Sequence, residues 1–296
     1  MANSAPELRY LFFLGCTIPY RVLSYEVSAR KIAEKLGLRL MEMPEFNCCG
    51  LPLDPINHEM MLALSARNLC LAERQGLPIM TLCNGCAGTL RNVNRTLKED
   101  KEAKARLNGY LKEIGMEFKG TTEVKHLIQI LAEDVGLERI RSIVKKPFKN
   151  LKVAQHYGCH LLRPSKEIGF DNPEDPAVLK KLIELTGARC LDYADEIQCC
   201  GATVSGINSE IPLQLVREKL QHIKEAGAQA LITICPSCHL TFDFNQPRME
   251  RSFGEKFDIP VLHYPQLLAL AADMNINELA LEEHKVNVLE KISLFC

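Results

Sequence analysis

The 296-residue sequence lacks features that would assign it to several broad classes of protein. It has no uninterrupted apolar run approaching the ~18 residues that a membrane-spanning helix needs. It has no basic stripe or charged tail, and its formal net charge is −1, which argues against nucleic acid and anionic lipid as partners. Its opening residues do not resemble a secretory signal. We therefore expect a cytoplasmic protein without a membrane span.

Cysteine, in contrast, is abundant, with 13 residues in the chain. A long chain with an odd number of cysteines and no export signal does not fit a secreted protein held together by disulfides. In a reducing compartment, clustered cysteines more often serve as metal ligands or redox groups. The composition therefore raises the question of which metal the chain binds.

Ten of the cysteines form two copies of one pattern, in the order Cys, Cys-Cys-Gly, C-x-x-C. The first copy comprises Cys16, Cys48, Cys49, Cys83 and Cys86, and the second comprises Cys159, Cys199, Cys200, Cys235 and Cys238. The three landmarks of one copy lie 143, 151 and 152 residues from those of the other. Because the order is kept while the spacing varies slightly, we predict two related halves that differ in their loops.

The residues around these landmarks predict strands alternating with helices. Short apolar runs that predict strands span residues 9–14, 38–43, 78–82, 151–157, 189–193 and 230–234. Segments with helical periodicity include residues 22–36, 58–74, 176–185 and 213–226. This alternation predicts an α/β fold with two pseudo-symmetric, Rossmann-like parallel-sheet halves. The cysteines then lie at the carboxyl ends of the strands, where open α/β sheets bind their ligands.

A domain boundary is predicted at residues 146–147, where a proline stops a helix before the next strand. Residues 98–146 are charged and mostly helical in pattern, so we interpret them as a connector. The prediction is a first cysteine-rich domain at residues 1–146, including this connector, and a second at residues 147–296. Apolar spacing in residues 275–289 predicts a C-terminal helix that packs on the core of the chain, with docking of a partner subunit as the alternative.

Five thiolates per copy favour a polynuclear iron–sulfide site. A structural zinc ion takes four ligands, and adjacent cysteines are poorly placed to occupy two vertices of one tetrahedron. A catalytic dithiol needs only its own pair, which leaves three cysteines of each copy without a role. Gly50 and Gly201 allow the chain to turn tightly against sulfide. Zinc at one motif with a cluster at the other remains an open alternative.

The cysteine pattern resembles the "CCG" cysteine-rich domain. Two copies in one chain, with Gly15-Cys16 and Gly158-Cys159-His160 opening them, resemble the B subunit of heterodisulfide reductase over about residues 9–270. The resemblance implies two noncubane [4Fe-4S] clusters, one on each set of five cysteines. It also implies a disulfide substrate between the clusters, such as coenzyme M–coenzyme B heterodisulfide, cleaved to two thiols by one-electron chemistry at each cluster.

The same resemblance implies partners in an anaerobe. The sequence contains neither G-x-G-x-x-G nor a P-loop, so electrons must come from another polypeptide. The implied donor is a ferredoxin-like [4Fe-4S] subunit, like the C subunit of these reductases, and a flavin/iron–sulfur protein like their A subunit supplies it. A relay can use the same ligands as a catalyst. The alternative function is therefore a non-catalytic electron-transfer subunit of a larger anaerobic oxidoreductase complex.

Two residues beside Cys159 are predicted to act in catalysis. His160 could donate a proton to a departing thiolate, and Arg163 could hold an anionic substrate group. Arg21 and Arg91 are weaker candidates for that second role. Four residues in or beside the C-x-x-C pairs are predicted to form hydrogen bonds there: Asn84, Thr89, Ser237 and His239. His156 and His222 are predicted to be structural, and Cys70 and Cys190 to lie in the core. Cys296 is predicted to have no role.

Overall fold

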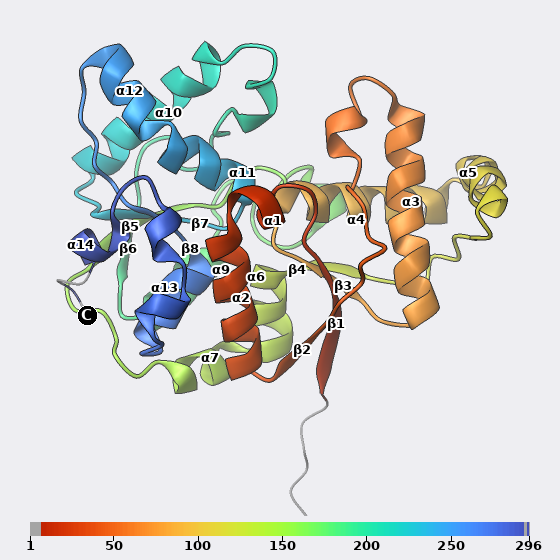
Figure 1. Cartoon of the computed structure of the whole chain (residues 1–296), viewed down its shortest axis with the longest axis horizontal. Helices are drawn as coiled ribbons and strands as arrows, with labels where there is room; N and C mark the ends of the chain where they lie inside the picture. Colours follow the sequence, from red (N-terminus) through yellow and green to blue (C-terminus); the bar gives the residue numbers. More distant parts are fainter. Residues whose placement is uncertain (1–6, 293–294, 296) are drawn as a thin grey trace, which may run out of the picture.

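The computed structural model describes residues 7–292 and residue 295, which fold into two four-stranded parallel sheets (Figure 1). The first sheet contains β1 (Leu8–Phe13), β2 (Leu38–Met41), β3 (Ile79–Thr81) and β4 (Val124–His126). The second contains β5 (Lys152–His156), β6 (Arg189–Leu191), β7 (Ala230–Thr233) and β8 (Val261–His263). Their orders, β2-β1-β3-β4 and β6-β5-β7-β8, are equivalent. The predicted α/β fold with two pseudo-symmetric halves is confirmed.

Helices connect the strands in both halves. The first half contains α1 (Ile18–Arg21), α2 (Leu23–Lys35), α3 (His58–Gln75), α4 (Asn84–Glu99), α5 (Lys101–Glu113), α6 (Leu127–Gln129) and α7 (Leu137–Ile143). The second contains α8 (Ser165–Ile168), α9 (Val178–Leu185), α10 (Glu210–Glu225), α11 (Pro236–His239), α12 (Gln246–Phe253), α13 (Tyr264–Ala271) and α14 (Val288–Ile292). Helix α3 begins where the Asn57 side chain accepts the Met60 N–H, and ends at left-handed Gly76.

Each sheet is buried on both faces, as parallel sheets usually are. Side chains alternate along β1, where Tyr10 and Phe12 enter a core between the two sheets while Leu11 and Phe13 enter an outer core. The central core includes helices α2, α9 and α13, and α2 packs directly on α13 (Figure 1). Helices α3, α4 and α5 cover the outside of the first sheet, and α10 and α12 that of the second. The strands thus form two separate sheets, one on each side of residue 146. The central core, however, contains residues from both halves. The division into two domains therefore stays a prediction.

The segment interpreted as a helical connector contains a strand that was not predicted. Residues 124–126 form β4 and complete the first sheet, and β8 completes the second in the same way. Both strands are three residues long, too short for a clear periodicity, and neither precedes a motif cysteine. Each ends in a buried histidine whose backbone N–H donates to a glutamine three residues later, Gln129 at 3.0 Å and Gln266 at 2.8 Å.

The C-terminal segment packs as predicted but is not one helix. Short 3₁₀ helices span Ile276–Glu278 and Leu281–Glu283, and α14 begins only at Val288. Ala280 between them has a left-handed φ of 51°. The backbone N–H groups of Lys285 and Val286 donate to the Asp243 carboxylate, at 2.8 and 3.2 Å, instead of to a helical carbonyl. Leu279, Leu281 and Val286 are nevertheless buried. Cys296 lies outside the described residues, and no helix among the described residues is long and apolar enough to cross a membrane.

Candidate functional site

The ten motif cysteines gather at the carboxyl edges of the two sheets. Cys16 and Cys159 follow β1 and β5, the central strands that open the two motifs. Cys83 and Cys235 follow β3 and β7 and stand at the starts of α4 and α11. Because parallel strands all end at one edge of a sheet, residues distant in the sequence meet there.

The first five cysteines form a continuous group of thiols. The Sγ atoms of Cys16 and Cys48 lie 3.8 Å apart. Cys49 hydrogen-bonds to both Cys48 and Cys86, and these contacts lower the pKa of the Cys49 thiol to about 4. Cys86 also bonds to Cys83, and the contacts with both neighbouring thiols, with burial, raise the pKa of Cys86.

The second five repeat this arrangement. The Sγ atoms of Cys159 and Cys199 lie 3.9 Å apart, and those of Cys200 and Cys238 lie 3.4 Å apart. Hydrogen bonds from Cys159 and Cys200 lower the pKa of Cys199 to about 2. Cys235 bonds to Cys238 and completes the group.

The two groups meet at Cys83 and Cys235: Cys83 packs against the core that contains Cys235, and the interaction of the two thiols raises the pKa of Cys83. A cavity of about 70 Å³ opens beside this contact. Its lining residues include four cysteines of the first motif, together with Pro236 and Ser237 of the second. The cavity is therefore bordered by both halves of the molecule.

Backbone geometry at the glycines brings the chain close to sulfur. The N–H of Gly50 donates to Cys48 Sγ at 3.4 Å, and that of Gly201 donates to Cys199 Sγ at 3.3 Å. Both glycines have positive φ, 94° and 77°. A Cβ on Gly15 would lie 3.0 Å from Cys86 Sγ. Each site thus presents five soft sulfur donors and backbone N–H groups directed at sulfur, a set that fits an iron–sulfide group.

The two non-cysteine residues predicted to act in catalysis lie in different surroundings. His160 is half-buried against α4: a Cβ on Gly85 would lie 3.6 Å from its Nδ1, and one on Gly88 would lie 3.0 Å from its carbonyl oxygen. Arg163 is exposed, and its guanidinium donates to the carbonyls of Ile197 (3.2 Å) and Pro173 (2.9 Å). His160 is thus close to the first motif, whereas Arg163 braces the loop before Cys199. Their catalytic roles stay predictions.

The remaining candidates lie around the two groups of thiols. Asn84 donates to the Tyr157 carbonyl at 2.7 Å and so links the halves. Buried His239 stacks on His263, with ring centroids 4.2 Å apart. Arg21 is exposed, and Arg91 donates to the Ile168 carbonyl. Thr89 is buried, and the Nδ1 of half-exposed His222 lies 3.2 Å from an Asp195 oxygen. Cys70 and Cys190 are buried, as predicted.

Sequence reasoning missed two residues beside the second group. His156, predicted to be structural, is buried and offers a ring nitrogen within 4.8 Å of the sulfurs of Cys200 and Cys238. Lys219 is 1% exposed, and Cys200 and Cys238 are among the groups whose charge acts on its ammonium. A lysine within an otherwise apolar helical face could have pointed to such a position.

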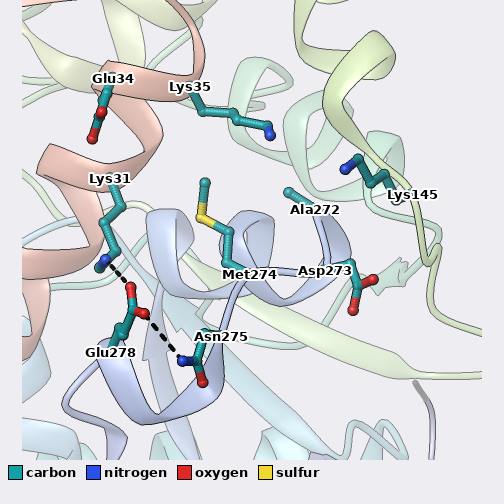
Figure 2. A pocket seen from close by; sticks show the side chains of 9 residues that line it. All are labelled: Lys31, Glu34, Lys35, Lys145, Ala272, Asp273, Met274, Asn275 and Glu278. Carbon is teal, nitrogen blue, oxygen red and sulfur yellow. Dashed lines mark hydrogen bonds and ion pairs between the residues drawn. The ribbon is translucent and has the colours of Figure 1, made fainter.

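A larger surface pocket of about 500 Å³ lies away from the cysteines (Figure 2). It forms between the carboxyl end of α2 and residues 272–278, and α2 runs away from the edge where the cysteines gather. Three of its polar residues pair with one another: Lys31 with Glu278, and Asn275 with Glu278 at 3.0 Å. The cysteine edge, with its convergent thiols, is the better candidate for chemistry.

A family model described as a cysteine-rich domain, CCG, matches residues 10–91 and 153–243, which contain both groups of thiols. The chain belongs to the CCG family. It is 42% identical to the B subunit of the ferredoxin/F(420)H(2)-dependent CoB-CoM heterodisulfide reductase of Methanosarcina acetivorans, over 94% of each chain. This similarity places it with the B subunits of heterodisulfide reductases, as the cysteine pattern predicts.

Relatives in the CCG family carry other names too. The chain is 32% identical to the 8-methylmenaquinol:fumarate reductase membrane anchor subunit of Wolinella succinogenes, over 95% of this chain and 98% of that one. A crystal structure of a hypothetical protein from Helicobacter pylori shares the fold, with a TM-score of 0.74 and 17% identity, and it matches 96% of this chain and 53% of that one.

Proposed function

We propose that this CCG protein is the catalytic subunit of a heterodisulfide reductase complex, with a noncubane [4Fe-4S] cluster on each group of five cysteines. The observation that carries the proposal is the meeting of all ten thiols in one continuous group, joined through Cys83 and Cys235. The similarity to the B subunit of a heterodisulfide reductase over 94% of the chain supports it. The substrate would be a disulfide such as coenzyme M–coenzyme B heterodisulfide.

When bound, two such groups supply two single electrons, the number that cleavage of a disulfide into two thiolates requires. The protein contributes the cavity beside Cys83, which is lined by four cysteines of the first motif and by Pro236 and Ser237 of the second. A disulfide that reaches this cavity would lie against the first group of thiols, next to its contact with the second. Leu14, Leu51 and Pro52 give the cavity an apolar wall that limits the access of water.

His160 is the proposed proton donor to a departing thiolate, because it lies between the halves beside α4. Arg163 is the proposed holder of an anionic substrate group, although its guanidinium already donates to two carbonyls. Exchange of those carbonyls for a carboxylate or phosphate would require the loop that Arg163 braces to move.

The proposed partners are a ferredoxin-like [4Fe-4S] subunit, which delivers electrons, and a flavin/iron–sulfur subunit that supplies it. The names of the relatives support partners of this kind, since the Methanosarcina acetivorans protein is one of the subunits of a ferredoxin/F(420)H(2)-dependent reductase. The sequence itself offers no nucleotide fingerprint through which this chain could take up a hydride.

A second candidate function is electron relay without catalysis. It is favoured by the similarity to a fumarate reductase membrane anchor subunit, whose name assigns it to a complex with a different acceptor. A relay would carry the same ligands but would not reduce a disulfide by itself.

The first test is the content of iron, zinc and acid-labile sulfide in protein purified without oxygen. We expect roughly eight irons per chain with matching sulfide, as two four-iron clusters require. About four irons with one zinc would contradict a mechanism that needs both sites, and zinc alone would rule out redox chemistry. Spectroscopy of the iron then distinguishes noncubane from cubane clusters. Reduction of a disulfide by the chain with an artificial one-electron donor separates catalyst from relay.

A further inference from the structure

The two cysteine sites differ at the end of the central strand. Phe13 ends β1 three residues before Cys16, and His156 ends β5 three residues before Cys159. Phe13 packs on Phe46, with ring centroids 5.1 Å apart. His156 instead places a ring nitrogen within 4.8 Å of the sulfurs of Cys200 and Cys238. The second site therefore has a polar ring where the first has an apolar one.

Neither nitrogen of His156 has a hydrogen-bond partner among the described residues. Its ring packs edge-on against Phe242, with centroids 4.8 Å apart, and is 1% exposed. A buried imidazole retains an N–H, and an unpaired buried donor is costly. The nearby sulfurs of the second group are the acceptors that this position offers.

The helices that follow the Cys-Cys-Gly motifs differ in charge. Asn68 of α3 and Lys219 of α10 both lie 19 residues after the second cysteine of their Cys-Cys pair. Asn68 is neutral and donates to the Cys48 carbonyl at 3.2 Å. Lys219 donates to the backbone carbonyls of Asp195 and Glu196, so it brings a cation to the equivalent position.

Asp195 is the strongest of the charges acting on the Lys219 ammonium, followed by Cys200, Cys238 and Glu196. An Asp195 oxygen lies 3.2 Å from His222 Nδ1, and Glu196 accepts from Gln155 at 2.6 Å. Lys219 forms no ion pair with any residue between 7 and 292, and it stands 5.4 Å from the centre of the Tyr193 ring. Within that range no carboxylate pairs with it directly, and its charge acts on the thiols of Cys200 and Cys238 as well as on Asp195 and Glu196.

We propose that His156 and Lys219 make the second site the more easily reduced of the two. This inference rests on the proposed function, because it concerns the clusters that the cysteines would hold. Uptake of one electron from a donor such as a reduced viologen adds one negative charge at a site and breaks no bond. A cation and a hydrogen-bond donor stabilise that added charge, and both raise the reduction potential of an iron–sulfur cluster. Phe13 and Asn68 offer the first site neither.

The test is an anaerobic redox titration with a viologen mediator, followed by electron paramagnetic resonance, on the full chain loaded with iron. Lys219→Met is expected to make reduction of the second site about tenfold less favourable, a shift of about 59 mV for one electron. His156→Phe is expected to make reduction of the second site several-fold less favourable. Lys219→Arg, which keeps the charge, is expected to leave the potential close to that of the unchanged protein.

Three further variants assign the signals, extend the effect to the first site and provide a control. Cys200→Ser removes a ligand of the second site, so the signal that remains belongs to the first. Phe13→His gives the first site the ring of the second, and it is expected to raise the lower potential and narrow the gap. Lys224→Met is the matched control: it removes the same charge from an exposed position on α10.

The inference is overturned if the potential of the first site is the higher one, or if Lys219→Met and His156→Phe shift neither potential or both equally. Iron content separates this outcome from failure of the proposed function. A chain without iron contradicts both, whereas a chain with two clusters of equal potential contradicts the inference alone. If Lys219→Met does not hold iron, the sign of the shifts in His156→Phe and Phe13→His decides the matter.

Discussion

The first cysteine site is more open to solvent than the second. Cys16 is exposed and Cys83 half-buried, whereas their counterparts Cys159 and Cys235 are half-buried and buried. The cavity beside the contact between the halves is lined mainly by the first motif. The first site thus combines access with apolar surroundings, and the second combines enclosure with His156 and Lys219. A duplicated backbone has kept its thiols and diverged in the side chains that surround them.

Under the proposed function, this difference would give the two sites different roles. An open site suits contact with a substrate, and an enclosed site near a positive charge suits storage of an electron until a second arrives. Both properties are local, because each depends on a few side chains at equivalent positions of one fold. Variants of matched residues in the two halves can therefore test whether the two sites differ in this way.

The largest effect is expected from loss of a buried ligand. Cys49→Ser and Cys200→Ser each remove an equivalent thiol, one from each half. We expect each variant to lose roughly four of eight irons, because the five ligands of the other site remain. Iron and sulfide analysis of anaerobic protein measures this. Loss of all iron from either variant would show that the two sites cannot form independently, which the Cys83–Cys235 contact would then explain.

The next effect concerns the central core that joins the halves. Leu267 in α13 is fully buried in that core, and Leu107 in α5 is fully buried in the outer core of the first half. Leu→Ala at either position is expected to lower the free energy of unfolding by roughly 2–5 kcal/mol. Leu267→Ala should leave a single unfolding transition in urea, because its core is shared. Two separate transitions in the unchanged protein would contradict a shared core and support two independent domains.

The sequence was sufficient to predict the repeat, the parallel sheets and the gathering of the cysteines, because each depends on regular spacing. Strands β4 and β8 were missed, because three residues show no periodicity and because, unlike the equally short β3 and β6, neither is followed by a motif cysteine. The C-terminal helix was predicted from apolar spacing, but Ala280 and the Asp243 carboxylate interrupt it. Tertiary contacts of this kind are not encoded in local pattern.

The candidate site shows the same limit. The ten cysteines carry their own spacing signal, so they could be found from the sequence. His156 and Lys219 act only through neighbours that folding supplies: one ends a strand, and the other reaches a loop 23 and 24 residues earlier in the chain. Comparing the two halves position by position reveals both, once the structure fixes which positions are equivalent.

A smaller effect is expected in the C-terminal segment, which follows the second sheet and contains His284. Burial lowers the pKa of His284 to about 4, whereas the unfolded chain would take up this proton near its ordinary pKa of about 6.5. The folded state therefore loses stability as the pH falls from about 6.5 to about 4, by roughly 3 kcal/mol for this group. His284→Gln should remove that part of the acid sensitivity, measured by urea unfolding at pH 7 and pH 4.5.

Asp243 contributes with the opposite sign, which makes it a useful control. Burial raises the pKa of its carboxyl group to about 6, so the folded state holds a proton that the unfolded chain releases near pH 4. Stability from Asp243 is thus present at low pH and is lost as the pH rises through about 6. Asp243→Asn should make the protein more sensitive to acid. If the free energy of unfolding of both variants depends on pH as in the unchanged protein, burial does not shift the pKa values of His284 and Asp243 in this way.

The smallest effect is expected at a hydrogen bond between the halves. Asn84 is buried and donates to the Tyr157 carbonyl at 2.7 Å, and the equivalent position of the second motif is Pro236, which has no amide to return the contact. Asn84→Ala leaves that carbonyl unsatisfied and is expected to cost about 1–3 kcal/mol of unfolding free energy. Asn94→Ala is the matched control, because Asn94 makes a similar bond, 3.0 Å to the Thr122 carbonyl, within the first half. If Asn84→Ala shifts the reduction potentials of both sites and Asn94→Ala shifts neither, the contact between the halves sets the relative position of the two sites. If the two variants have the same effect on the potentials, Asn84 contributes to stability alone.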